Sequence, residues 1–459
     1  MRIASLYVKN IRLFGNEEQT ITFDGSKNVT ILLGDNGAGK TSLLYGCSVL
    51  LSQFYKHFPN CSTKNFTESD VRNVSNERKS DYLHVGVRLI PTDPNVTEYM
   101  DRDAADDKEQ ISVHMYKKGN DTDATPTSEL KAISDYSLRI KTKIDNGEVV
   151  ALPVIAYYGT ERGQIKPVER RRDFNEIFPR WDIYRADSLD SATDFKRFFT
   201  WFERNEDLER REQLLQLKQK GTSNYSSHVL DAVRTALNRL FPDYLQNPRV
   251  ETSPLRFVMD DISNPENPIE HRLERMSDGY RITIALVADI AARLAEANPS
   301  PEVSGLDDPL QANGIVMIDE IDLHLHPKLQ REILARLTSI FPNVQFVVST
   351  HSPNVVIGAL DFVQLVKLDS GVIDDSIDEE RYDTYDISLL LLSDLFDQVD
   401  VRTREYMELS KKYENLLAKS VLSAEDKVEI DRLGKMLRSF SSDDILQFRK
   451  MLSKMQCHD

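Results

Sequence analysis

Short runs of alternating hydrophobic and polar residues open the chain. Residues 2–33 contain three such runs, each typical of a strand, separated by the polar turns FGNEEQ and DGSKN. Runs of the same kind recur at 82–90 and 110–118, with polar stretches between them. The pattern therefore predicts a strand-rich N-terminal part that leads directly into a glycine loop beginning at residue 34.

Longer apolar runs alternate with helical patterns in the rest of the chain. Apolar strands are expected within 148–163, 314–327 and 344–353. Apolar residues spaced by three and four within 170–250 and 273–298 are typical of amphipathic helices. Because strands that alternate with helices favour parallel pairing, we predict an α/β fold with a mainly parallel sheet, N-terminal antiparallel strands and a helical lobe.

The same pattern divides the chain into four parts. An N-terminal lobe that contains the glycine loop is expected over 1–165, and a helical insertion over 166–272. A second lobe with its own strands and helices follows over 273–377. The last part, 378–459, has few β-branched runs and is expected to be a short helical appendage.

Composition limits the kind of protein. A chain of 459 residues with 40% hydrophobic and 29% charged residues is long enough for a large core and a second lobe. The net charge of −16 argues against a surface that grips nucleic acid throughout, so contact with DNA is expected to be indirect or made through a complex. The three cysteines lack the spacing of a zinc site. The sequence has no signal peptide and no membrane-spanning run, which predicts a cytoplasmic protein.

A phosphate-binding loop is the strongest chemical signal. Residues 34–41, GDNGAGKT, match the pattern GxxxxGK[ST] between an apolar strand and the start of a helix. In such a loop Lys40 meets the β- and γ-phosphates of a nucleotide, and the Thr41 hydroxyl ligates Mg²⁺. The residues expected to bind the nucleotide are Asn36, Gly37, Ala38, Gly39, Lys40, Thr41 and Ser42. A chance glycine turn is the alternative.

Two acidic residues at the end of an apolar strand fit the same chemistry. In GIVMIDEIDLHLHP, Asp319 is placed to hold Mg²⁺ directly or through water, and Glu320 to orient or deprotonate the attacking water. Alone, such a pair often caps the next helix; beside a phosphate loop it indicates hydrolysis. The next apolar strand ends in STHSP, where His351 either hydrogen-bonds the γ-phosphate or the attacking water, or is a turn histidine satisfied by the backbone.

The order of these motifs resembles a known class of ATPases. The phosphate loop, MSDGYR, VMIDEIDLHLHP and STHSP look like the Walker A, signature, Walker B with D-loop, and H-loop motifs of the ABC-type ATPase heads of the SMC and RecF class. The resemblance implies that two heads enclose ATP, with Ser277 and Gly279 of one subunit reaching the nucleotide held by Lys40 of the other. It also implies a D-loop role for Asp322 against the partner subunit. Seen alone, Ser277 is an ordinary helix N-cap.

Within that class, the chain is similar to the PtuA family of ATPases from Septu anti-phage defence systems, a family also found with retrons. The similarity rests on PVIAYYGTERG, SDGYRITIALVADIAARLA, EIDLHLHPKLQ and the short helical tail. It implies an ATPase that converts ATP and water to ADP and phosphate, slowly or as a regulatory step. It further implies head-to-head dimers or larger oligomers and a partner HNH nuclease of the PtuB type, with no nuclease site in this chain.

Two other functions remain open. A RecF- or SMC-like repair ATPase would clamp DNA on its own as an ATP-dependent dimer, although the acidic balance makes a large phosphate-contacting surface less natural. A transporter-type ABC ATPase would act with a membrane partner, for which the sequence gives no signal.

Several further residues have open roles. Arg12 matches the position where related heads carry an arginine near the nucleotide, and is otherwise a solvated turn arginine. Tyr157, Tyr158 and Arg162 lie where a Q-loop-like element is expected, but no glutamine stands in that turn. His324 and His326 suggest a metal site, yet two histidines without an acidic cluster favour a D-loop or packing role.

Overall fold

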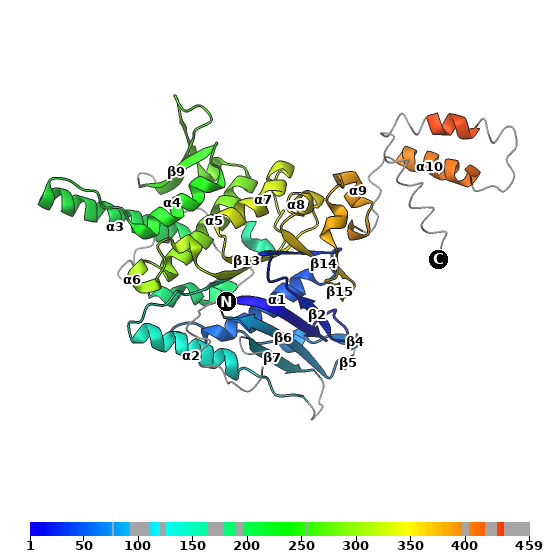
Figure 1. The fold of residues 1–459 in the computed structure, drawn as a ribbon, viewed down its shortest axis with the longest axis horizontal. Helices are drawn as coiled ribbons and strands as arrows, with labels where there is room; N and C mark the ends of the chain where they lie inside the picture. Colours follow the sequence, from blue (N-terminus) through cyan, green and yellow to red (C-terminus); the bar gives the residue numbers. More distant parts are fainter. Residues whose placement is uncertain are drawn as a thin grey trace. The chain divides into compact units, whose positions relative to one another are not determined.

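The fold is described from a computed structural model (Figure 1). The residues that it describes are 1–75, 78–91, 110–119, 125–163, 179–189, 196–252, 255–396, 404–417 and 429–435. The chain divides into two compact units, Met1–Asp383 and Thr384–Asp459. Among the described residues, no helix combines the length and the apolar character needed to cross a bilayer.

A six-stranded sheet forms the centre of the first unit. Its strands lie in the order β15, β14, β3, β13, β12, β8, and all neighbours pair in parallel except β15 with β14. The strands are β3 (Val29–Leu33), β8 (Val154–Tyr158), β12 (Gly314–Ile318), β13 (Val344–Ser349), β14 (Val363–Asp369) and β15 (Val372–Asp374). Every residue of β3, β8, β12 and β13 is buried, which explains their continuous apolar runs. The mainly parallel sheet that the sequence predicts is confirmed.

A second, antiparallel sheet has the strand order β2, β1, β6, β7. Its strands are β1 (Arg2–Lys9), β2 (Gln19–Thr22), β6 (Tyr82–Ile90) and β7 (Ile111–Lys118), and a small hairpin pairs β4 (Asn73–Ser75) with β5 (Arg78–Lys79). The helix α1 (Lys40–Leu51) contacts strands of both sheets. Leu6, Leu43, Met317 and Val347 meet in the core between them. Apolar packing from two sides therefore fixes the helix that follows the phosphate loop.

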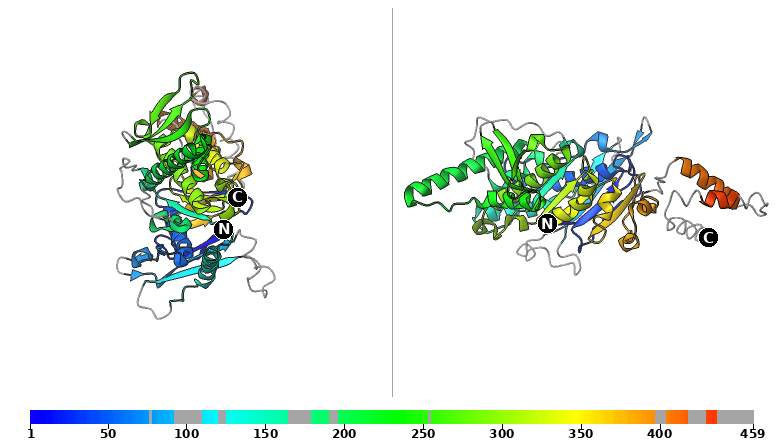
Figure 2. Two further views of the ribbon diagram at one scale, coloured as in Figure 1. Left: turned by 90° about the vertical axis from the view of Figure 1, so that its left-hand side faces the viewer. Right: turned by 90° about the horizontal axis from the view of Figure 1, so that it is seen from above.

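The remaining helices of the first unit gather mostly beside the parallel sheet (Figures 1 and 2). They are α2 (Lys131–Asp145), α3 (Lys196–Lys220), α4 (His228–Leu240), α5 (Asp278–Ala297), α6 (Pro301–Ser304), α7 (Pro327–Ile340) and α8 (Pro353–Ile357). The helix α4 packs against both α5 and α7. The helix α2 was not predicted from the sequence, although its buried Ile133, Tyr136 and Ile140 follow helical spacing.

Residues 245–272 differ from the predicted helical insertion. They form a three-stranded antiparallel sheet of β9 (Leu245–Thr252), β10 (Leu255–Asp261) and β11 (Ile269–Arg272). Phe257 of β10 packs against the phenylalanines at the start of α3. Strand pairing and this aromatic contact are tertiary effects, so the helical interpretation of the whole insertion was wrong for this part.

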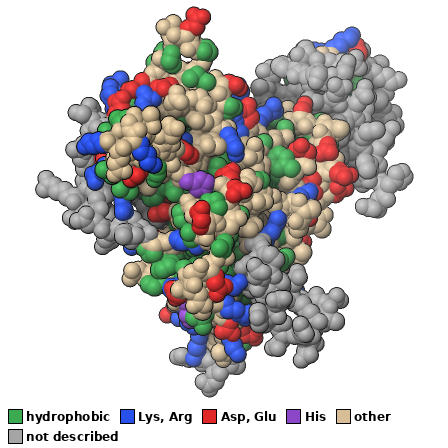
Figure 3. Space-filling view, turned by 60° about the vertical axis from the view of Figure 1, so that its left-hand side comes forward, with side chains coloured by type: hydrophobic (Ala, Val, Ile, Leu, Met, Phe, Trp, Pro, Cys, Tyr) green, Lys and Arg blue, Asp and Glu red, His purple; other side chains and the backbone are tan. Residues whose placement is uncertain are grey.

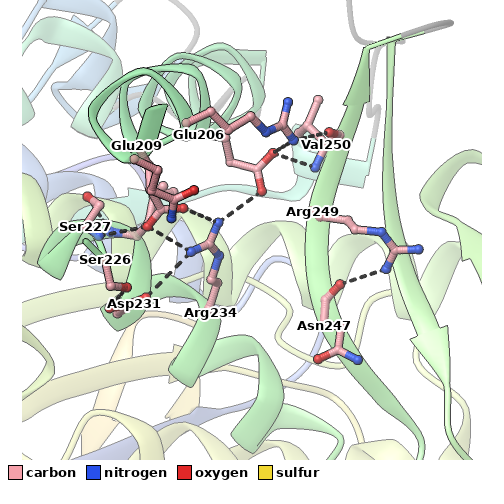
Figure 4. Close-up of polar contacts among 12 residues, drawn as sticks. Glu206, Glu209, Ser226, Ser227, Asp231, Arg234, Asn247, Arg249 and Val250 are labelled. Atoms are coloured by element: carbon pink, nitrogen blue, oxygen red, sulfur yellow. Dashed lines mark hydrogen bonds and ion pairs between the residues drawn. The ribbon is translucent and has the colours of Figure 1, made fainter. Parts of the chain in front are cut away.

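Ionic contacts hold α3 to α4 (Figure 4). Arg234 of α4 donates to Glu206 Oε1 at 3.2 Å and to Glu209 Oε2 at 2.8 Å, and both glutamates are buried. Glu206 also accepts the backbone N–H of Val250 at 3.0 Å. These ion pairs and this hydrogen bond therefore fix the middle of α3 against α4 and β9.

The second unit is helical where it is described. It contains α9 (Ile387–Leu391) and α10 (Arg404–Leu417), and residues 429–435 are also helical. The rest of the helical appendage predicted over 378–459, residues 397–403, 418–428 and 436–459, lies outside the described residues.

Candidate nucleotide site

The phosphate loop joins the buried end of β3 to the start of α1. Gly34, Gly37 and Gly39 have φ values of +140°, +83° and +115°, which residues with a side chain rarely adopt. Gly39 is the N-cap residue of α1. The first N–H groups of this helix have no partner within the helix and, together with the helix dipole, favour an anion at this end.

Lys40 lies across the loop. Its Nζ donates to the carbonyl oxygens of Gly34 at 2.6 Å and Asp35 at 3.0 Å, and to Nε2 of His351 at 2.9 Å. Because an ammonium group can only donate, this imidazole nitrogen is the acceptor. Burial lowers the pKa of Lys40, and nearby carboxylates, first that of Asp319, act in the opposite direction. The structure thus brings together the lysine and the histidine that the sequence assigned to one phosphate.

Asp319 is fixed by two hydroxyl groups. Its Oδ2 accepts a hydrogen bond from Thr41 Oγ1 at 2.7 Å, and its Oδ1 accepts one from Ser349 Oγ at 2.5 Å. Asp319 is 2% exposed and stands directly after β12. A hydroxyl and a carboxylate side by side offer the oxygen ligands that Mg²⁺ prefers, so Thr41 and Asp319 fit the predicted metal position.

Glu320 has an unusual backbone conformation. Its φ is +49°, in the left-handed region, where a residue other than glycine is strained by about 1 kcal/mol or more. Its N–H donates to Ser349 Oγ at 2.8 Å. Strain of this kind persists only where several contacts define the conformation, and it is common at functional sites.

These residues surround one pocket of about 160 Å³. The lining residues are Leu13, Asn36, Gly37, Gly39, Lys40, Thr41, Ser42, Asp319, Glu320 and His351. Ala38 is buried and does not line this pocket. Most of the predicted nucleotide-binding residues and both predicted catalytic residues therefore share one space.

The STHSP segment contributes more than its histidine. Thr350 Oγ1 donates to Asp322 Oδ1 at 2.5 Å, and Ser352 Oγ donates to Gln330 Oε1 at 2.8 Å. With Ser349 on Asp319, three hydroxyl groups at the end of β13 and just after it contact the segment that follows β12 and the helix α7. From the sequence a role was assigned only to His351 here, because the partners of these hydroxyl groups are distant in sequence and become visible only in the fold.

The signature residues lie elsewhere. Ser277 is the exposed N-cap residue of α5, and its side chain makes no capping hydrogen bond. Gly279 is buried, and a Cβ there would meet the carbonyl oxygen of His324 at 2.7 Å, so only glycine allows this close approach. Both line a separate cleft of about 870 Å³, between the end of α4 and the start of α7. The structure does not bring them to the phosphate-loop pocket of the same chain.

Arg12 is not among the residues that line the phosphate-loop pocket, although its neighbour Leu13 is. Its guanidinium donates to Asp70 Oδ1 at 3.1 Å and lies 4.4 Å from the ring centre of Tyr45. Asp70 also accepts a hydrogen bond from the Tyr45 hydroxyl at 3.2 Å. Through these contacts Arg12 connects the turn after β1 to the segment around Asp70.

The two histidines after Walker B have different local roles. His326 caps α7, where its Nδ1 accepts the N–H of Lys328 at 3.3 Å. His324 has a φ of +62° and presents its carbonyl to Gly279. Within the described parts of the chain, no group of three or more His, Cys, Asp or Glu residues is arranged to hold a metal.

Comparison with known families agrees with this geometry. A family model described as an AAA domain matches residues 5–226. A second, described as an AAA domain, putative AbiEii toxin, Type IV TA system, matches residues 243–357. The two matches cover the phosphate loop and the acidic strand end respectively.

Individual relatives come from bacterial retron and Septu systems. The chain is 27% identical to the retron Ec83 probable ATPase of Escherichia coli, over 97% of this chain and 85% of the relative. It is 32% identical to the Septu protein PtuA of Bacillus mycoides, over 37% of this chain and 23% of that protein. Among solved structures, the SMC head domain from Thermotoga maritima matches with a TM-score of 0.44 and 17% identity, over 82% of this chain and 100% of that chain. Over residues 5–226 and 243–357 the chain thus matches AAA-domain family models, and its relatives include a retron probable ATPase and Septu PtuA.

Proposed function

We propose that this chain binds and hydrolyses Mg·ATP in the phosphate-loop pocket, and that the nucleotide controls its assembly in a defence complex. The observation that carries the proposal is the pair of hydrogen bonds that Asp319 accepts from Thr41 and Ser349, at 2.7 and 2.5 Å. They set a buried carboxylate beside the hydroxyl with which it would share a metal ion.

Each residue of the pocket has a distinct task in this proposal. Lys40 and the N–H groups at the start of α1 bind the phosphates. Thr41 and Asp319 hold Mg²⁺, which when bound neutralises charge on the phosphate oxygens. Glu320 accepts the proton of the attacking water, and His351 holds the γ-phosphate or that water.

We also propose that a second copy completes the site. Ser277 and Gly279 line a cleft separate from the phosphate-loop pocket, so within one chain they are not among the residues that line it. A head-to-head dimer would bring Ser277 of one copy to the nucleotide held by the other, as the resemblance to ABC-type heads implies. The exposed helix start at Ser277 is suited to an anion.

The biological role that we propose is defence against phage. The support is the similarity to a retron ATPase and to Septu PtuA. In this role the chain assembles as dimers or larger oligomers and regulates a partner HNH nuclease, which performs the cleavage. ATP then serves mainly to hold the complex in one state.

A DNA clamp of the RecF or SMC kind is the alternative. It would act without a nuclease partner and would need a cationic surface for the DNA backbone. On the face drawn in Figure 3, lysine and arginine side chains are interspersed with aspartate and glutamate, so this face does not supply that cationic surface.

Co-expression tests the partner. When the chain is produced with a tagged HNH protein encoded beside it, we expect the two to co-purify as one species of defined mass. Mass measurement by light scattering, with and without ATP, shows whether the nucleotide changes the assembly. A chain that elutes alone and instead binds gapped DNA with a steep salt dependence would support the clamp.

A further inference from the structure

A buried arginine lies behind the acidic residues of the pocket. Arg162 is on the 3₁₀ turn η4 (Thr160–Gly163), which follows β8 directly. The strand β8 pairs in parallel with β12, so the turn after β8 lies at the end of the sheet where Asp319 and Glu320 stand. Arg162 is 1% exposed, which is rare for an arginine without a specific partner.

The guanidinium binds two consecutive carbonyl groups. Arg162 Nη1 donates to the carbonyl oxygen of Asp319 at 2.5 Å and to that of Gly159 at 2.8 Å. Its Nη2 donates to the carbonyl oxygen of Glu320 at 2.6 Å. The planar fork of an arginine can hold both carbonyls at once, whereas the single ammonium of a lysine cannot reproduce that geometry.

These contacts act on a strained residue. Glu320 has a φ of +49°, and its N–H donates a hydrogen bond to Ser349 Oγ. Both peptide groups of Glu320 are therefore held, one by Ser349 and one by Arg162. Removing either of these two contacts would let the backbone relax and turn the Glu320 carboxylate away from its position in the pocket.

The positive charge of Arg162 is compatible with its buried position near the acidic residues that follow β12. Burial lowers the pKa of Arg162 to about 10, while the carboxylates of Asp319, Glu320 and Asp322 act in the opposite direction. At neutral pH the guanidinium is still protonated, so it also offsets part of the negative charge gathered at the end of β12.

We propose that Arg162 is a positioning residue for ATP hydrolysis. It fixes the carbonyl groups of Asp319 and Glu320 and thereby aims the Glu320 carboxylate into the phosphate-loop pocket. It does not line that pocket itself. This inference rests on the proposed function, because Arg162 acts only through Glu320.

The test compares Arg162→Lys with a matched control. We expect Arg162→Lys to lower kcat for ATP about 10- to 100-fold, because small displacements of a reacting group have effects of this size, and to change KM by less than about 3-fold. Arg180 is the control, since it too donates to three backbone carbonyls, those of Val150, Ala297 and Val303, away from the pocket. Arg180→Lys is expected to lower thermal stability as much as Arg162→Lys does, but to leave kcat unchanged.

A double-mutant cycle separates positioning from general destabilisation. If Arg162 acts through Glu320, adding Arg162→Lys to Glu320→Gln lowers the residual rate no further. Arg162→Gln, which keeps two N–H donors without the charge, serves if the lysine variant does not fold. Unchanged kcat in the Arg162 variants, equal losses at Arg180, or additive effects with Glu320→Gln would each overturn the inference. Absence of turnover in the wild type would instead contradict the proposed function.

Discussion

Replacing Lys40 by alanine is expected to raise the Kd for ATP at least about 100-fold. Loss of one partner of a buried, charge-assisted contact removes about 3 kcal/mol or more, and each 1.4 kcal/mol is a factor of ten in Kd. Lys40 lies against His351 and the loop carbonyls, inside the pocket that Thr41 and Asp319 also line. Calorimetric titration with a non-hydrolysable ATP analogue measures the change.

Lys27 provides the control for this substitution. It is also partly buried and donates to Glu379 at 3.1 Å and to the carbonyl of Val363 at 2.7 Å, but it does not line the pocket. Lys27→Ala is expected to lower thermal stability and leave the Kd for ATP unchanged. An unchanged Kd in Lys40→Ala would contradict the assignment of the phosphate loop.

The second large effect is expected for Glu320→Gln. A general base contributes about 10²- to 10⁴-fold, so the hydrolysis rate should fall at least about 100-fold. Glutamine has nearly the same shape, and the backbone contacts of residue 320 with Ser349 and Arg162 do not involve the side chain. ATP binding is therefore expected to change less than about 3-fold, and any ATP-dependent dimer should persist instead of turning over.

Steady-state phosphate release and light scattering measure the two parts of this prediction. Glu379→Gln is a suitable control, because Glu379 pairs with Lys27 outside the pocket. Wild-type turnover in Glu320→Gln would contradict the general-base role. If Glu320→Gln and Glu379→Gln lost the same share of the hydrolysis rate, destabilisation would explain the loss instead.

Sequence patterns predicted the parts of the site that depend on residue type and order. The phosphate loop follows a fixed spacing between strand and helix, and Asp319 and Glu320 end an apolar strand. Parallel strands place their carboxyl ends at one edge of a sheet, so Lys40, Asp319 and His351 meet in one pocket although they are far apart in sequence. The parallel sheet followed from the same alternation of strands and helices.

Other features depend on contacts that no local pattern reveals. Arg162 acts on backbone carbonyls, which every residue carries, and Ser349 acts through a hydroxyl whose partners follow the neighbouring strand β12. The sheet of β9, β10 and β11 depends on pairing between strands and on Phe257 packing against α3. The placement of Arg12 against Asp70 likewise joins residues 58 positions apart.

Because the signature residues and the phosphate loop line two separate pockets, we propose that the nucleotide site is shared between two copies. Ser277 is exposed and makes no capping bond, so Ser277→Arg should leave the fold and the pairing of copies intact while removing the contact of Ser277 with the nucleotide held by the other copy. Lys40→Ala removes the other half of the shared site. Each variant alone is expected to lack ATP hydrolysis.

Mixing the two purified variants shows whether the site is shared. A mixed dimer contains one complete site, made of Lys40 from the Ser277→Arg chain and Ser277 from the Lys40→Ala chain. Random pairing makes about half of the dimers mixed, each with one of two sites complete, so phosphate release should recover to about a quarter of the wild-type rate. No recovery on mixing, while Ser277→Arg alone still binds ATP, would contradict a site shared between two copies.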